Sequence, residues 1–473
     1  MARIILLLHR YLGIGVGVLM AMWCLSGIVM MYVSYPALAE SARLTALEPI
    51  VWNGCCKVPQ ALRASLWSGG STIEMLTGRP VLFSGASQDA RPIDLLMGTP
   101  IENISVRQAT EIARRFTEKV RAKPRVLGLI DHDQWTVSGD FKPERPLYRI
   151  AFGDAAGTEL YVSSISGRAV QITDARQRFW NWFGAVPHWL YFTELRRHAG
   201  LWSQIVIYAS LLGCFLAGIG IYLGVRQMAA QPSGRWSPYV GFNLWHHVAG
   251  LVFGVFTLTW VLSGLLSMNP WGWLEGGGAH AENTKIQGAP GTPDAQLAAL
   301  QSLADAHPIA LALKAAPLNG RLYFVAWLPG GGALRLDTQG APAPLSPSDL
   351  DLLSGALQAA AAPELLAQED NFYFSHHQER VTLPVYRTVL PSGQRYYLDA
   401  VSGRLVAKFD AQARGYRWLH QGLHRLDFAA SLRIRPRWDG LMLLLMTGVT
   451  AVCVTGTILG YRRVTRKGSA IKS

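Results

Sequence analysis

The chain alternates long apolar runs with long polar stretches. Four runs, near residues 4–33, 203–225, 245–268 and 439–461, are each long enough to cross about 30 Å of hydrocarbon, which takes roughly 20 helical residues. A long polar stretch follows the first run and another follows the third, whereas the second and third runs are joined by a short loop. This pattern predicts a membrane protein with four transmembrane helices and two large polar domains.

The basic residues predict how the chain lies in the membrane. Segments rich in Lys and Arg stay on the cytoplasmic side, and three segments here are basic and free of acids. Their basic residues are Arg3 and Arg10 at the N-terminus, Arg226 and Arg235 in the short loop, and Arg462, Arg463, Arg466, Lys467 and Lys472 in the tail. Both termini are therefore expected in the cytoplasm and both polar domains outside it. Much of the net charge of +13 is explained in this way, and with no nucleic-acid motif present we expect no nucleic-acid partner.

The second half of the chain repeats the first. Aligning His9 with His246, an offset of 237 residues, makes eight of the nineteen positions in 9–27 identical without a gap. Near the end of each polar stretch "SISGRAV" is echoed by "AVSGRLV" at an offset of 236, and "YLGVR" at 222–226 is echoed by "ILGYR" at 458–462. Each copy begins and ends on the same side, so we expect two parallel repeats related by a pseudo-two-fold axis along the membrane normal.

The repeat and the hydropathy together predict the domain organisation. Each outward domain is expected to be α+β, with a helix at 105–119 in the first and alternating strands such as "LYRIAF" and "RYYLDA". The stretches 276–293 and 328–347 are rich in Gly and Pro and are expected to be loops. Ser203 and Asp439 occupy equivalent positions suited to capping the second and fourth helices. The predicted segments are helix 1 at 1–33, outward domain 34–175, interfacial segment 176–202, helix 2 at 203–226, cytoplasmic loop 227–243, helix 3 at 244–269, outward domain 270–411, interfacial segment 412–438, helix 4 at 439–463 and cytoplasmic tail 464–473.

Two equivalent histidines lie inside the first and third apolar runs. A polar residue in a span is costly, which makes it a functional candidate, and the repeat predicts that His9 and His246 face each other at one depth (the inner pair). Gly13 and Gly17 share a helix face with His9, as Gly250 and Gly254 do with His246. An imidazole beside a groove without side chains suits a flat macrocycle with bis-histidine iron ligation. Alternatively, the glycines serve close helix packing and the histidines are hydrogen bonders.

A second equivalent pair, His188 and His424, lies in the interfacial segments and is expected on the outer side (the outer pair). Three further histidines, His198, His247 and His420, have no histidine counterpart and are alternative ligands. Two stacked sites predict two haems and a path for electrons. We predict no catalytic acid, base or nucleophile among the side chains, since the cofactors carry the chemistry. No GxGxxG motif is present, so the electron donor is expected to be a separate cytoplasmic reductase or a quinol.

The motifs "LHRYLG…LSG", "YLDAVSGRLV", "SHHQERVTLPVYR" and "ILGYRR" resemble the PepSY-associated transmembrane proteins over essentially the whole chain. That family includes inner-membrane siderophore reductases of the Fox type. The resemblance implies four transmembrane helices, two periplasmic PepSY-like domains and two haem b groups held by histidines, here placed at His9, His246, His188 and His424. It implies reduction of Fe(III) in a periplasmic siderophore and release of Fe(II), in the bacterial inner membrane.

Two other functions fit the same topology. The chain could be a regulatory or binding membrane protein whose outward domains restrain a partner, without redox activity, or it could be a haem or iron permease. Haem content distinguishes two of these functions, because the reductase is expected to contain haem and the regulatory protein is not. Adjacent Cys55 and Cys56 allow a vicinal disulfide or a reduced pair, and the sequence does not decide between them.

Overall fold

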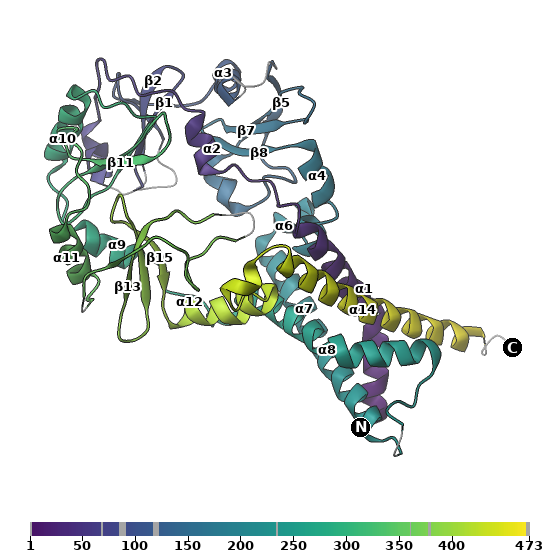
Figure 1. Cartoon of the computed structure of the whole chain (residues 1–473). Helices are drawn as coiled ribbons and strands as arrows, with labels where there is room; N and C mark the ends of the chain where they lie inside the picture. Colours follow the sequence, from purple (N-terminus) through teal and green to yellow (C-terminus); the bar gives the residue numbers. More distant parts are fainter. Residues whose placement is uncertain are drawn as a thin grey trace.

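The computed structural model describes residues 2–67, 70–84, 91–116, 123–232, 235–359, 361–376 and 380–469. Its four long helices are α1 (Ala2–Met30), α7 (Ala199–Ala229), α8 (Gly241–Ser267) and α14 (Arg437–Ser469). Each is long and apolar enough to cross a membrane, which confirms the four predicted spans. The helices gather at one end of the molecule with both chain ends, and the sheets lie at the other end (Figure 1).

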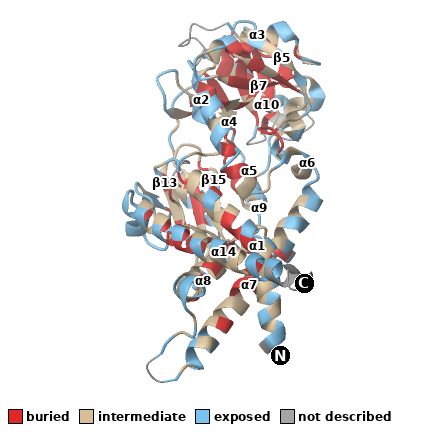
Figure 2. Ribbon diagram, turned by 90° about the vertical axis from the view of Figure 1, so that its right-hand side faces the viewer, coloured by how far each residue is buried: buried red, intermediate tan, exposed pale blue. Residues whose placement is uncertain are grey.

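The four helices pack as one bundle. Helix α1 packs along α14 and α7 along α8, and contacts of α14 with α8 and of α1 with α7 complete the bundle. The apolar core between them includes Met20, Trp260, Met446 and Val449. Buried residues are concentrated in the sheets, whereas the long helices are largely intermediate or exposed (Figure 2). Apolar side chains exposed along a helix are what a span in contact with lipid requires.

Short helical pieces separate the sheets from α7 and α14, as expected for segments that do not cross the membrane. The first set is α4 (Ala175–Asn181), α5 (Ala185–His188) and α6 (Thr193–Arg196). The second set is α12 (Ala411–Tyr416), the π-helical η4 (Arg417–Gly422), α13 (Leu423–Arg425) and the 3₁₀ turn η5 (Ala430–Arg433).

The predicted cap at Ser203 is wrong. Helix α7 already begins at Ala199, so Ser203 lies inside its second turn. Asp439, its predicted equivalent, lies in the first turn of α14 rather than before the helix. There its carboxylate pairs with Arg435 at 3.3 Å. Helix α7 begins four residues before the predicted start at 203 and α14 two residues before the predicted start at 439, because local hydropathy fixes a helix start only to within a few residues.

A seven-stranded antiparallel sheet is shared between the two polar stretches. Its strand order is β11-β10-β9-β1-β2-β3-β4, and β1 pairs with β9 so that Ile73 lies opposite Leu313. Strands 1–4 come from the first stretch and 9–11 from the second. The bounds are β1 Thr72–Leu76, β2 Arg79–Phe83, β3 Ile93–Asp94, β4 Thr99–Pro100, β9 Ala312–Ala315, β10 Phe324–Trp327 and β11 Ala333–Leu336.

Each stretch also forms a four-stranded antiparallel sheet, and the predicted strands are found there. The first is β5 (Arg125–Ile130), β6 (Leu147–Ala151), β7 (Glu159–Ser163) and β8 (Ala169–Thr173); the second is β12 (Glu364–Leu366), β13 (Val385–Val389), β14 (Arg395–Asp399) and β15 (Leu405–Phe409). The remaining helices are α2 Glu40–Thr45, η1 Gln60–Trp67, α3 Val106–Phe116, η2 Gly139–Glu144, η3 Pro270–Gly272, α9 His280–Gln287, α10 Pro293–Asp305 and α11 Pro347–Ala356. The α+β character of the polar stretches is confirmed.

Two predicted loops contain regular structure. The stretch 276–293 holds helix α9, and 328–347 holds strand β11, whose Phe324↔Leu336 pairing adds it to the edge of the shared sheet. Both elements are short and flanked by glycines, so composition alone concealed them. Cys55 and Cys56 form a vicinal disulfide, and Cys56 belongs to an apolar core that combines residues of both stretches.

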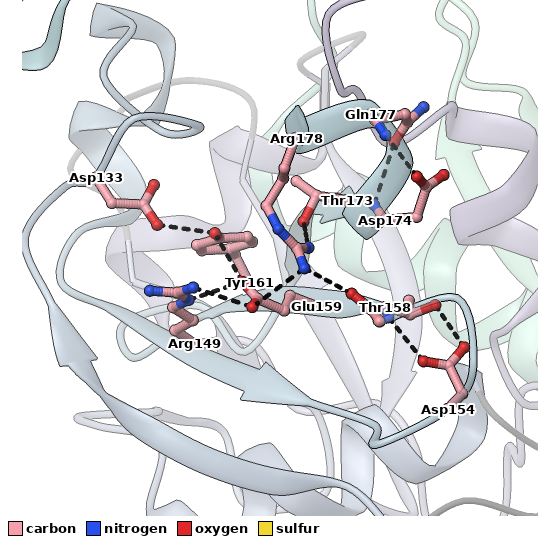
Figure 3. A network of polar contacts seen from close by, with 11 residues as sticks. Asp133, Arg149, Asp154, Thr158, Glu159, Tyr161, Thr173, Asp174, Gln177 and Arg178 are labelled. Atoms are coloured by element: carbon pink, nitrogen blue, oxygen red, sulfur yellow. Dashed lines mark hydrogen bonds and ion pairs between the residues drawn. The ribbon is translucent and has the colours of Figure 1, made fainter. Parts of the chain in front are cut away.

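A polar network fixes the start of the first interfacial segment on its sheet (Figure 3). Arg178 of α4 donates hydrogen bonds to Thr173 Oγ1 and to the Gly157 carbonyl, at 2.7 and 2.8 Å, and lies 3.5 Å from the Glu159 carboxylate. A capping box between Asp174 and Gln177 closes the N-terminus of α4. The segment leading to His188 therefore leaves the sheet at a defined position.

Candidate functional site

The inner pair faces across the bundle. His9 on α1 and His246 on α8 have ring centroids 6.3 Å apart, with ring planes at 39°. Nδ1 of His246 contacts the Thr455 hydroxyl of α14 at 3.1 Å. Two imidazole nitrogens that share one metal, each about 2 Å from it, would place their ring centres roughly 6 Å apart. The spacing of this pair therefore fits a bis-histidine metal centre.

A cavity of about 490 Å³ surrounds the inner pair. Glycines from all four long helices form much of its wall, which leaves backbone rather than side chains facing the space. They are Gly13 and Gly17 of α1, Gly220 and Gly224 of α7, Gly250 and Gly254 of α8, and Gly456 and Gly460 of α14. A flat ligand held between the two imidazoles needs room of this kind.

The four glycines singled out from the sequence play two different roles. A Cβ on Gly13 or Gly250 would meet nothing within 4 Å, so both border open space. A Cβ on Gly17 would lie 2.6 Å from Thr457 Oγ1, and one on Gly254 would lie 3.0 Å from Ile221 Cγ1. Open space and close helix packing thus both occur, one turn apart on the same helix faces.

Two glycines that sequence reasoning missed lie directly against the inner imidazoles. A Cβ on Gly220 would be 2.7 Å from Cε1 of His9, and a Cβ on Gly456 would be 2.8 Å from Cε1 of His246. The two glycines are 236 residues apart, the offset of the second part of the repeat. That shared offset was the available signal, but only packing shows that each glycine makes room for a ring.

The outer pair also faces across the bundle. His188 at the end of α5 and His424 in α13 have ring centroids 6.2 Å apart, at 73°. Nδ1 of His188 lies 3.0 Å from the Trp23 carbonyl oxygen, and Nδ1 of His424 lies 2.9 Å from the Ser263 hydroxyl. The outer rings are thus anchored to α1 and α8, the helices that carry the inner pair.

These anchors fix which ring nitrogen remains available. A carbonyl oxygen only accepts, so Nδ1 of His188 carries the hydrogen and Nε2 keeps its lone pair. Ser263 donates its own hydroxyl to the Trp260 carbonyl at 2.9 Å, so it accepts from Nδ1 of His424. Burial lowers the pKa of His188, and lowers that of His424 well below its usual value, which favours the neutral imidazole that binds metals.

The three alternative histidines lie in different surroundings. His198 is exposed just before α7 and accepts a hydrogen bond from its neighbour Arg197. His247 lines the inner cavity, but its ring nitrogens contact Ser237 Oγ and the Gly224 carbonyl. His420 lies beside His424, with ring centroids 5.4 Å apart, and its Nδ1 donates to the Ser263 carbonyl at 2.9 Å.

The two pairs lie at two separate levels of the bundle. Ser26 contacts His188 at 3.1 Å. It follows His9 by 17 positions on α1 (26 − 9), which corresponds to about 25 Å of helix. Trp23 and Trp260 lie next to the outer pair, because their carbonyls contact His188 and Ser263. Their indole Nε1 atoms are buried without a hydrogen-bond partner among the described residues. Within those same residues no cluster of three or more His, Cys, Asp or Glu forms a metal site, so the paired histidines are the candidates for metal ligation.

Comparison with known families agrees with this architecture. Residues 6–463 match the family described as the PepSY-associated TM region. A search of curated proteins gave no match. The match extends from the first long helix to the last and includes both histidine pairs, and the chain therefore belongs to the PepSY-associated transmembrane family.

Proposed function

We propose that this protein is a di-haem b-type reductase of the bacterial inner membrane that passes electrons outward to a periplasmic ferric siderophore. The observation that carries the proposal is the spacing of two facing histidine pairs, 6.3 and 6.2 Å between ring centroids, at two levels of one helix bundle. When bound, haem supplies a one-electron Fe(III)/Fe(II) couple at each level.

The residues present fit that cofactor. At the inner level His9 and His246 would hold the haem iron, and Gly13 and Gly250 leave the bordering space free of a Cβ. At the outer level His188 and His424 would be the ligands, with Nδ1 of each held by Trp23 or Ser263. Anchoring the second nitrogen orients a ligand ring and raises its basicity.

The topology supports outward electron flow. The halves are proposed to be parallel repeats whose equivalent histidines meet on the pseudo-two-fold axis, with both termini cytoplasmic. Two PepSY-like periplasmic domains would each include one four-stranded sheet and would be joined by the shared seven-stranded sheet. The inner pair would then lie near the cytoplasmic side, where a separate reductase or a quinol donates electrons. The outer pair would lie near the periplasmic side, where ferric siderophore accepts one electron and Fe(II), bound less tightly, is released.

Haem quantitation with a reduced-minus-oxidised spectrum tests the proposal. We expect the purified chain to contain two haems with b-type bands, and ferric siderophore to reoxidise them after reduction. His9→Ala or His246→Ala should leave about one haem, the outer one, since the two sites share no ligand. His188→Ala or His424→Ala should leave the inner one. His132→Ala, in an exposed Asp131–His132 contact of the sheet region, is the control and should retain both.

Two results would favour the competing functions. A folded, colourless preparation from haem-replete cells would eliminate the reductase and leave a regulatory or binding role. Uptake of labelled iron or haem into vesicles without any reductant would instead identify a permease.

A further inference from the structure

The inner cavity has one charged wall. Arg10 of α1 and Arg463 of α14 both line it, and these two helices pack against each other. Neither guanidinium forms an ion pair with any carboxylate in the part of the chain that the structure describes. Two unpaired positive charges therefore border a largely apolar space.

Among the described residues, the opposite wall carries no arginine or lysine. The repeat offsets of 237 and 236 make His247 the counterpart of Arg10 and Gln227 the counterpart of Arg463, and both line the same cavity. Nδ1 of His247 contacts Ser237 Oγ of the short loop at 2.8 Å, and the His247 ring stacks on Trp236 of the same loop. The two repeats therefore differ at this level of the bundle, because both arginines lie on α1 and α14 and neither lies on α7 or α8.

The unbalanced charge identifies the kind of group that belongs there. The Arg10 guanidinium is half-buried, and a charge in low-dielectric surroundings is costly unless an anion with hydrogen-bond acceptors pairs with it. Arg463 is exposed but lines the same cavity, so it offers a second donor to the same anion. Arg binds carboxylates in bidentate geometry. Arg10 follows the ligand His9 directly, and Arg463 lies two turns beyond Gly456, whose added Cβ would touch His246. Both charges are therefore near the imidazole pair, toward the chain ends.

We propose that Arg10 and Arg463 bind the two carboxylate groups of the inner tetrapyrrole and fix its orientation, with the carboxylate edge toward α1 and α14. This inference rests on the proposed function, because it assumes that the cavity holds haem. It gives these arginines a positioning role in addition to setting the topology. An arginine that only sets the topology needs to lie on the cytoplasmic side and does not need to face the cavity.

Spectral titration of the full-length apoprotein in detergent tests the proposal. A His188→Ala background leaves only the inner site, and each variant is titrated with haem and with haem dimethyl ester, whose carboxylates are neutralised. Arg10→Gln and Arg463→Gln should each weaken haem binding about tenfold, as loss of a charged hydrogen bond does, and the double variant more. Binding of the ester should change less than about twofold, because it has no charge to lose.

Arg462→Gln is the matched control. Arg462 adjoins Arg463 on α14 and is exposed, with its guanidinium over the Phe242 ring at 5.5 Å, so its loss should affect neither titration. Equal weakening of haem and ester, an equal effect of Arg462→Gln, or unchanged haem affinity in the double variant would overturn the proposal. An unmodified inner site that binds neither haem nor ester would overturn the proposed function itself.

Discussion

At the residue scale, the inner site depends on glycines, whose backbone borders the cavity without a side chain. Sequence reasoning could single out His9 and His246, because a polar residue in a span is costly and both occur at one repeat position. It could also single out Gly13 and Gly250 on the same helix faces. It could not separate a glycine that borders the cavity from one that packs against another helix, since that difference depends on which neighbouring helix lies opposite.

Gly220→Ala tests how closely the inner imidazole is fitted. The added Cβ would lie 2.7 Å from Cε1 of His9, inside the normal contact distance, so the ring must move from the position in which it faces His246. Under the proposed di-haem function, we expect haem content to fall from two to about one per chain, with loss of the inner haem signal. The measurement is haem quantitation with reduced-minus-oxidised spectra.

Gly218→Ala is the control for that variant. It lies on the same helix, and a Cβ there would meet nothing within 4 Å, so it should retain both haems. Full haem content in Gly220→Ala would mean that His9 does not need its present position to hold the cofactor.

At the scale of elements, a half-buried carboxylate holds the second four-stranded sheet. Asp370 accepts hydrogen bonds from the Tyr397 hydroxyl at 2.6 Å and from the backbone N–H groups of Phe372 and Tyr373 at 2.7 Å. Arg387 donates to it at 3.0 Å. Burial by itself raises the pKa of Asp370, but these hydrogen bonds outweigh burial and hold the pKa below its ordinary value.

The lowered pKa of Asp370 predicts acid sensitivity of this sheet. A carboxylate whose pKa is lower in the folded state contributes stability above its unfolded pKa, about 4, and loses it as the pH falls through the folded value. Asp370→Asn should therefore lower the free energy of unfolding at pH 7 by about 1–3 kcal/mol and flatten its decrease below about pH 4. Denaturant unfolding across pH measures both.

Asp351→Asn provides the comparison. Asp351 is exposed on α11, so its replacement should leave the pH profile unchanged. A profile for Asp370→Asn that matches the unmodified protein at acidic pH would remove the assigned role from Asp370.

The elements themselves were largely predictable. The strands around "LYRIAF" and "RYYLDA" were found where alternation placed them, and the four spans where hydropathy placed them. Strand β11 and helix α9 were missed, because each is only one short element between glycines. Their stability comes from the partner they pack on, such as β10 for β11, and a local pattern does not contain that partner.

At the scale of the whole molecule, one apolar core joins the two halves of the chain. Ile73 and Leu82 of the first half share it with Leu313, Phe324 and Leu336 of the second. The β1–β9 pairing lies across this junction. Disturbing one half at this core should therefore destabilise strands of the other half.

Phe324→Ala tests that coupling. Phe324 is 2% exposed, so its truncation should cost about 3–5 kcal/mol. We expect faster hydrogen exchange in β1 and β2 as well as in β9–β11, measured by mass spectrometry. Leu398→Ala, in a separate core of the second half, should leave β1 and β2 unaffected. Exchange confined to β9–β11 in Phe324→Ala would show that the halves fold independently.

The sequence by itself determined the four apolar spans, the internal repeat and the histidines placed at equivalent positions, because hydropathy, helical period and repeat offset are all written along the chain. Only the tertiary structure decided that His188 reaches His424 to within 6.2 Å between ring centroids, that Gly220 and Gly456 make room for the inner rings, and that both halves contribute to one sheet. These features arise where helices and strands far apart in sequence meet, and side-chain packing at such contacts has no local signature.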